Sequence, residues 1–324
     1  MTPSDPDLLA LALDWHRAGR KVAVAFVVQT WGSAPRAAGS ILVIDGEGGM
    51  EGSVSGGCVE GAVIVEALEA LEDGRPRVLD FGVSNDEAFA VGLACGGEIR
   101  ILVDPVGDAM PVDLLEDLVS RKAQTQPVAY VADLEGGSRA LATPDDYPDR
   151  FRLDRSGVED DARTFVAVQN PSLRLIVVGA VHIAQALVPM ARSCGFAPVL
   201  IDPRDAFGSA ARFPGEGIRD DWPDEAMAAL APDSRTAVVT LTHDPKLDDP
   251  ALQAALGSAA FYIGSLGSTR THAKRVDRLT DAGFTETDIA RIHAPVGLDL
   301  GGRAPAEIAV GIMAEIIATL RKAT

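Results

Sequence analysis

Cysteine and basic side chains are both scarce in this chain of 324 residues. Three cysteines are a sparse, odd set for a disulfide scaffold, so we expect the protein in a reducing cytoplasm. Only 29 Lys and Arg side chains stand against 47 Asp and Glu side chains, which gives a net charge of −18. Because nucleic acids and anionic membranes attract basic surfaces, this balance argues against either as the main partner. A small anionic ligand is not excluded, since a local group of backbone N–H donors can bind it.

Long apolar runs are also missing. No uninterrupted apolar segment reaches the roughly 18 residues that cross a bilayer, so we expect no membrane span. The first 19 residues have neither a basic start nor a small-residue cleavage site, and we therefore expect no signal peptide. With 47% hydrophobic and 23% charged residues, the composition is typical of a soluble globular protein with a large core.

The length and the hydrophobic patterning predict two domains, residues 1–169 and 170–324. The first is expected to be a mixed α/β domain. Apolar residues at helical spacing predict helices over residues 7–17, 59–71 and 112–121. Apolar runs predict strands over residues 21–30, 40–44, 78–83, 98–106 and 127–134. The polar segment 136–161 predicts edge hairpins and connections.

The second domain alternates strands with helices. Segments such as LRLIVVGAVHIAQALVPMARSCGFAPVLIDPRD and AAFYIGSLGSTRTHAKRVDRL each contain a strand, a tight turn and a helix. The last helix is predicted over residues 305–321. This alternation is typical of a Rossmann-like, doubly wound parallel sheet, so the predicted fold class is α/β.

The first turn of the second domain resembles the dinucleotide fingerprint G-x-G-x-x-G/A. Gly179 and Ala184 occupy its first and third positions, but Val181 replaces the second glycine, which lets a pyrophosphate approach the backbone. Asp202 ends the next strand, where a ribose-binding carboxylate belongs, and His182 begins the helix beside the crevice. The turn therefore predicts the Rossmann topology more strongly than it predicts NAD or NADP. A degenerate Rossmann domain that serves as a scaffold is the alternative.

A second loop joins another predicted strand to a helix and is rich in glycine and serine. N–H groups and hydroxyls at a helix N-terminus favour an anion, and Arg270 and Lys274 add positive charge nearby. The candidate phosphate-binding residues of this loop are Gly264, Ser265, Gly267 and Ser268. The alternative is an ordinary helix cap followed by surface bases.

The stretch GSVSGGCVEGAV places Cys58 directly after Gly56 and Gly57 and before a predicted helix. N–H groups at a helix N-terminus favour a thiolate, and paired glycines let a ligand approach the backbone. Cys95 also adjoins two glycines, so both cysteines are candidates to face one crevice, whereas Cys194 has a structural pattern. A thiolate without histidine ligands favours a soft metal, a sulfur carrier or a redox thiol, in that order. A small residue in a tight turn is the alternative.

Several of these motifs, taken in order, resemble the XdhC/CoxI family. The segment GSAPR that ends at Arg36, then Gly39, and then Gly52–Glu60 resemble its amino-terminal signature, and Cys95-Gly96-Gly97 resembles its second cysteine element. The second half continues the resemblance through GAVHIAQAL, LIDPRDAF, LTHDPKLDDPAL, YIGSLGSTRTHAKR and HAPVGLDLGGRAPAEIAVGIMAEIIA. One departure is Val181, where the family usually has the second glycine of G-A-G-H.

The resemblance implies a maturation chaperone more than a turnover enzyme. Such proteins are thought to bind the molybdenum cofactor, protect it, assist its sulfuration by a cysteine desulfurase, and insert it into an apo molybdenum hydroxylase of the xanthine dehydrogenase type. It further implies a homodimer. We expect the molybdopterin form of the cofactor, with Cys58 as the molybdenum contact and Arg36 as an anion contact. Its phosphate would lie at the Gly264–Ser268 loop or the Gly179 turn.

The sequence leaves two other functions open. A nicotinamide-dependent oxidoreductase would use the Rossmann domain, although Val181 and the lack of a placed acid or base for hydride transfer count against it. A sulfurtransferase or redox protein would use Cys58 and Cys95 as exchange thiols.

Overall fold

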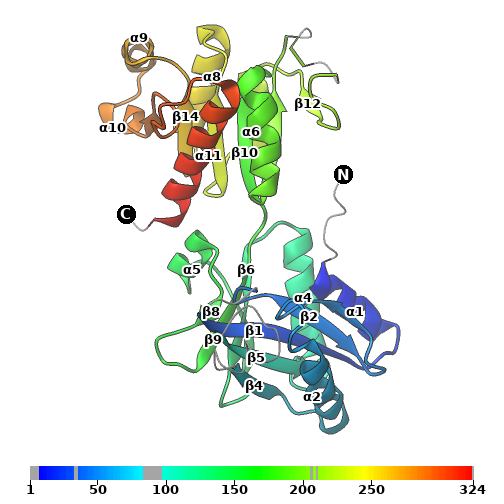
Figure 1. Cartoon of the computed structure of the whole chain (residues 1–324). Coiled ribbons are helices and arrows are strands. Elements are labelled where there is room, and N and C mark those ends of the chain that lie inside the picture. Colours follow the sequence, from blue (N-terminus) through cyan, green and yellow to red (C-terminus); the bar gives the residue numbers. More distant parts are fainter. Residues whose placement is uncertain (1–6, 33–35, 83–96, 205–206, 209–210, 323–324) are drawn as a thin grey trace. The chain divides into compact units, whose positions relative to one another are not determined.

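The computed structural model describes residues 7–32, 36–82, 97–204, 207–208 and 211–322. The chain divides into two compact units, Met1–Pro171 and Ser172–Thr324 (Figure 1). None of the helices in the described ranges is both long enough and apolar enough to cross a membrane.

The amino-terminal unit contains two antiparallel sheets. The five-stranded sheet has the order β3-β2-β1-β5-β4, with β1 Val22–Gly32, β2 Ile41–Asp45, β3 Met50–Gly52, β4 Arg77–Gly82 and β5 Gly97–Pro105. The four-stranded sheet has the order β7-β6-β9-β8, with β6 Val128–Asp133, β7 Arg139–Ala142, β8 Gly157–Val158 and β9 Thr164–Gln169. The helices of this unit are α1 Leu8–Arg17, α2 Glu60–Asp73, α4 Val112–Ala123 and α5 Pro148–Leu153. Helix α5 lies in the segment for which the sequence predicted hairpins and connections only, and it begins at Pro148, a residue favoured at the first helical position.

Strand β1 is the centre of this unit because both of its faces are covered. Ala23, Ala25 and Val27 pack towards α2. Phe26 points the opposite way, towards α1, α4 and the second sheet, where its ring stacks on that of Tyr130 at 5.1 Å between centroids. A strand buried on both faces needs a continuous apolar run, which explains the segment VAVAFVV.

The carboxy-terminal unit is a six-stranded parallel sheet with the order β12-β11-β10-β13-β14-β15. Its strands are β10 Leu173–Val178, β11 Phe196–Ile201, β12 Ile218–Arg219, β13 Thr236–Thr240, β14 Tyr262–Ser265 and β15 Ile292–His293. The first strand in sequence lies in the middle and the chain winds outward in both directions, which is the Rossmann order. The predicted doubly wound α/β fold is therefore confirmed.

Helices cover both faces of this sheet. Leu175 and Val177 of β10 pack with α6 His182–Ser193 and α11 Pro305–Arg321. Ile176 and Val178 face the other side, against α7 Pro223–Leu230 and α8 Pro245–Leu256. Helix α9 Thr269–Asp281 and the short α10 Glu286–Ile289 complete that layer.

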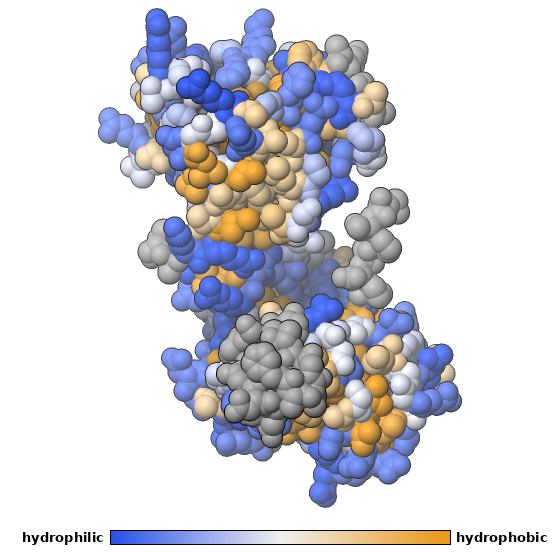
Figure 2. Space-filling model, viewed as in Figure 1, coloured by the Kyte–Doolittle hydropathy of each residue, from blue (hydrophilic) through white to orange (hydrophobic). Residues whose placement is uncertain are grey.

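Helix α11 carries apolar side chains on two sides. Its buried residues pack on the sheet, whereas Val310 and Ile317 are exposed. Figure 2 shows apolar side chains gathered on the surface of the carboxy-terminal unit. The two-sided pattern explains why the sequence GIMAEIIA is apolar almost throughout.

Candidate functional site

The glycine-rich turn that carries Cys58 joins β3 to α2. Gly56 and Gly57 have φ values of 78° and 110°, a left-handed conformation that glycine adopts without steric penalty. Cys58 is exposed and is a free cysteine among the described residues, and α2 begins two residues later, at Glu60. The sequence thus predicted both the turn and the helix that follows it.

The carboxylate of Glu60 occupies the inside of this turn. Its Oε1 accepts hydrogen bonds from the N–H groups of Val54 at 3.2 Å and Ser55 at 2.9 Å, and from the hydroxyl of Ser53 at 2.8 Å. Its Oε2 accepts the N–H of Gly57 at 2.9 Å and the Ser55 hydroxyl. Glu60 is only 5% exposed. The turn therefore closes around a side chain of the protein itself.

These contacts keep Glu60 ionised although it is buried. Burial raises the pKa of this carboxyl, but the hydrogen bonds from Ser55 and Ser53 outweigh it and lower the pKa to about 2. The Ser55 hydroxyl in turn accepts the N–H groups of Cys58 and Val59, both at 2.9 Å. The N–H groups of Gly57, Cys58 and Val59, which precede α2, are thus already bonded within the turn. Glu60, two residues after Cys58, is the sequence feature that could have indicated this closed turn.

Arg36 lies at a cavity beside the same turn. The cavity has a volume of about 280 Å³, and Ser53 and Gly52 line it together with Arg36. Glu51 also lines it and supplies a negative charge. The structure therefore brings Arg36 to the glycine-rich turn, while its contact with an anion stays a prediction.

The other cysteines do not complete a site in the described residues. Cys95 lies outside them, so its distance from Cys58 is not described. Cys194 is exposed at the end of α6. Across the described ranges, no group of three His, Cys, Asp or Glu side chains is placed to hold a metal ion.

The Rossmann turn is built around Gly179 and Asp202. Gly179 has a φ of 114°, and a Cβ there would lie 2.7 Å from the Thr242 side chain, so only glycine fits. Val181 precedes α6, and His182, the first residue of that helix, is exposed. The turn is therefore tight for structural reasons that require no nucleotide.

The carboxylate of Asp202 is engaged by neighbours. It accepts the Ala180 N–H at 2.7 Å and two side-chain hydrogen bonds from Arg204, both at 2.8 Å. Burial raises the pKa of Asp202, but the bonds from Arg204 and Ala180 outweigh it and lower the pKa below its usual value. In this arrangement Asp202 holds the turn against the adjacent segment, while its contact with a ribose stays a prediction.

The four residues proposed from the second glycine-rich loop do not form one cradle. Gly264 lies inside β14, where a Cβ would meet Val296 at 2.5 Å, and the buried Ser265 hydroxyl pairs with Thr240 at 2.6 Å. Gly267 has a φ of 141°, and Ser268 caps α9. Two of the candidates therefore serve the sheet, and two shape the start of the helix.

Comparisons with known proteins agree with this architecture. The model of the "XdhC and CoxI family" matches residues 15–82, and that of the "XdhC Rossmann domain" matches residues 175–316. A protein of Escherichia coli strain K12, named molybdenum cofactor insertion chaperone PaoD, is 30% identical over 316 residues, which cover 98% of this chain and 89% of that protein.

A second relative, from Bacillus subtilis strain 168, is named as a probable xanthine dehydrogenase subunit. It is 27% identical, with 92% of this chain and 93% of that protein covered. A solved structure from Bacillus halodurans, described as a xanthine dehydrogenase, superposes with a TM-score of 0.68 at 23% identity, covers 97% of this chain and 95% of its own, and supports the fold. By the family models and the Escherichia coli relative, this chain belongs to the XdhC and CoxI family.

Proposed function

We propose that this protein binds the molybdenum cofactor and transfers it to an apo molybdenum hydroxylase of the xanthine dehydrogenase type. The observation that carries the proposal is the similarity, along 98% of the chain, to a protein named as a molybdenum cofactor insertion chaperone. The name of the Bacillus subtilis relative supports a xanthine dehydrogenase as the recipient. The cofactor is cargo in this function, because it leaves with the recipient enzyme.

The turn at Cys58 has the properties that a transient contact with molybdenum requires. The thiol is exposed, so a bulky ligand can reach it and leave again. Sulfur is a soft ligand, and a single soft contact binds a metal without enclosing it. Five hydrogen bonds to Glu60 hold the backbone of the turn, so the thiol is presented from a fixed position. Arg36, at the neighbouring cavity, would contact an anionic group of the ligand.

The finer assignments belong to the same proposal. A cysteine desulfurase would sulfurate the bound cofactor, the cofactor would be the molybdopterin form, and the protein would act as a homodimer in the cytoplasm. Cys95, through its resemblance to the second cysteine element of the family, is proposed to join Cys58 at the metal end.

A retention assay tests the role of Cys58, and Cys194 provides a matched control. The full chain is loaded anaerobically with the cofactor and desalted, and molybdenum per chain is measured by mass spectrometry. Cys58→Ala should retain about tenfold less, the effect of losing roughly 1.4 kcal/mol of binding free energy. Cys194→Ala removes the other exposed thiol of the described residues and should retain the wild-type amount. Equal retention by both variants would remove Cys58 from the site.

Transfer is tested separately from binding. The loaded protein is mixed with a demetallated xanthine dehydrogenase-type enzyme, and the activity that appears is compared with that produced by free cofactor. Faster activation by the loaded protein supports the chaperone function. Retention without any gain in activation would reduce the protein to a storage role.

A further inference from the structure

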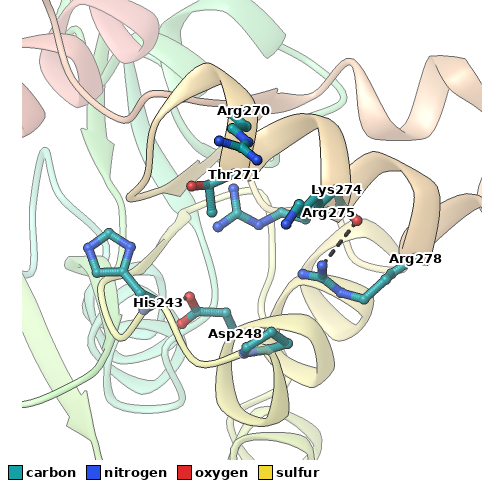
Figure 3. A pocket seen from close by; sticks show the side chains of 8 residues that line it. His243, Asp248, Arg270, Thr271, Lys274, Arg275 and Arg278 are labelled. Atoms are coloured by element: carbon teal, nitrogen blue, oxygen red, sulfur yellow. Dashed lines mark hydrogen bonds between the residues drawn. The ribbon is translucent and has the colours of Figure 1, made fainter.

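A cavity of about 330 Å³ lies along α9 in the carboxy-terminal unit (Figure 3). Four cations of this helix line it, and they are Arg270, Lys274, Arg275 and Arg278. Three of them are spaced four residues apart and so share one face of the helix. Such a concentration of positive charge is unexpected in a chain with a net charge of −18.

Arg275 is the most deeply buried of these cations, and most of its guanidinium N–H groups lack hydrogen-bond acceptors within the described ranges. It is only 2% exposed, and its Nη2 donates to the carbonyl oxygen of Leu266 at 3.0 Å. Among the residues that the structure describes, no acceptor forms a hydrogen bond with its Nε or Nη1. Figure 3 shows its guanidinium between Thr271 and Asp248, at the hollow of the cavity. A buried guanidinium with unbonded N–H groups is unfavourable, so this side chain is suited to an acceptor that the protein itself does not supply.

The remaining cations differ in how far they are engaged. Within the described residues, neither Arg270 nor Lys274 forms an ion pair with a carboxylate, and both are exposed at the mouth of the cavity. Arg278 is held by Asp249, which accepts from its Nη2 at 2.9 Å, and by the carbonyl of Lys274. Arg270, Lys274 and Arg275 are therefore the cations that remain available to a ligand.

One carboxylate also lines the cavity, but its oxygens are occupied. Asp248 accepts the Thr242 hydroxyl at 2.7 Å on Oδ1 and the His243 N–H at 3.1 Å on Oδ2. Burial raises its pKa, which favours its neutral form. Asp248 thus fixes the loop after β13, in which His243 has a left-handed φ of 63°. The available cations outnumber this single acid.

We propose that this cavity binds a phosphoryl group, as a phosphate monoester or a pyrophosphate, with Arg275 as its deep contact. A planar guanidinium matches two phosphate oxygens, while Arg270, Lys274 and the Thr271 hydroxyl would reach the others. The cavity adjoins the loops that follow β13 and β14, the edge at which doubly wound sheets bind their ligands. The site lies next to the glycine-rich loop, whose Leu266 carbonyl accepts a hydrogen bond from Arg275.

The proposed function supplies one source of the phosphoryl group, since the molybdenum cofactor carries a phosphate, and a nucleotide is another. The assignment depends on the proposed function only for that choice. Inorganic pyrophosphate is therefore the first probe, because it tests the phosphoryl site without the cofactor or a nucleotide. AMP and the cofactor are then compared as competitors, and the tighter competitor identifies the source.

The decisive experiment uses Arg275→Met with Arg303→Met as the matched control. Arg303 is exposed and does not line the cavity, so the same change of charge is made elsewhere. Calorimetry of the full chain should give pyrophosphate affinity about tenfold weaker for Arg275→Met and unchanged for Arg303→Met. Without ligand, Arg275→Met should melt at a higher temperature than the wild type, because the unbonded buried guanidinium is removed. Absent pyrophosphate binding by the wild type, or equal affinity in all three proteins, would overturn the site.

A second variant keeps the test decisive if Arg275→Met does not fold. Arg270→Gln combined with Lys274→Gln changes exposed side chains only and should leave the melting temperature unchanged. It should still weaken pyrophosphate binding several-fold and flatten its dependence on salt. Undiminished binding would contradict the proposal. A variant that loses pyrophosphate but keeps molybdenum would leave the proposed function standing, since the two readouts are independent.

Discussion

Two polar sites of this protein, one in each unit, differ in how completely their hydrogen bonds are satisfied. At the glycine-rich turn, the buried carboxylate of Glu60 accepts five hydrogen bonds. At the cavity along α9, the buried guanidinium of Arg275 makes one hydrogen bond within the described part of the chain and leaves two nitrogen atoms without partners there. The first arrangement stabilises a loop. The second is unfavourable by itself and becomes favourable only with a ligand.

The comparison suggests where a ligand enters such folds. Motif reasoning points to glycine-rich turns, because their N–H groups can bind anions. Here the N–H groups of one such turn bind Glu60, and the Ala180 N–H of another binds Asp202. A donor left unbonded by the fold is the more informative signal, and it is invisible until the packing is known.

The largest expected effect is a loss of stability when the hydrogen-bonded carboxylate of Glu60 is replaced. Glu60→Gln removes the charge that the turn binds, and the lowering of the Glu60 pKa from 4.5 to about 2 corresponds to a loss of up to about 3 kcal/mol in the free energy of unfolding. Glu69→Gln changes an exposed residue of the same helix and should alter it by less than about 0.5 kcal/mol. Urea unfolding measures both. If Glu60→Gln were as stable as Glu69→Gln, the hydrogen bonds to Glu60 would not stabilise the turn, and the contrast with Arg275 would fail.

Acid should weaken the same site in the wild type. The folded pKa of Glu60 is lowered, so its contribution to stability is complete above about pH 4.5 and is lost as the pH falls towards 2. The unfolding free energy of the wild type should therefore decline more steeply over this range than that of Glu60→Gln. Parallel pH profiles for the two proteins would show that Glu60 is not responsible.

A smaller difference in stability is expected between replacing a glycine of the turn and replacing a glycine of the helix that follows Cys58. Gly57→Ala forces alanine into a left-handed conformation with φ 110° and should cost about 1 kcal/mol. Gly61→Ala lies in the first turn of α2 with open space around it and should stabilise by up to about 1 kcal/mol. Thermal melts of the pair check the signs. Two changes of the same sign would mean that the turn is less fixed than its hydrogen bonds indicate.

Much of the fold could be predicted from local patterns. The apolar run of β1 indicated a strand buried on both faces, and the alternation after residue 170 indicated the parallel sheet. Helix α11 was predicted with the bounds that it has, Pro305–Arg321, because its apolar pattern begins at a proline. Helix α5 was missed because it is only six residues long and half of them are charged, so it has almost no periodic signal.

The candidate sites were harder to predict because hydrogen-bond partners are a tertiary property. Ser265 has the residue type and the position of a phosphate contact, yet its hydroxyl is buried against Thr240 of the neighbouring strand. Asp202 stands where a ribose-binding carboxylate belongs, yet Arg204 and Ala180 bind it. Residue type and spacing state what a side chain can do, and the packing determines which neighbour it meets first.

The sequence by itself determined most of the longer strands and helices and the glycine turns at Gly56, Gly57 and Gly179, because backbone preference and hydrophobic period act over a few residues. It also contained the family resemblance, which the comparisons confirm. Only the tertiary structure decided that Glu60 folds back into its own turn and that Arg275, in a helix of mostly polar residues, is buried with free donors. Burial and hydrogen bonding depend on segments brought together from distant parts of the sequence, and no local pattern encodes them.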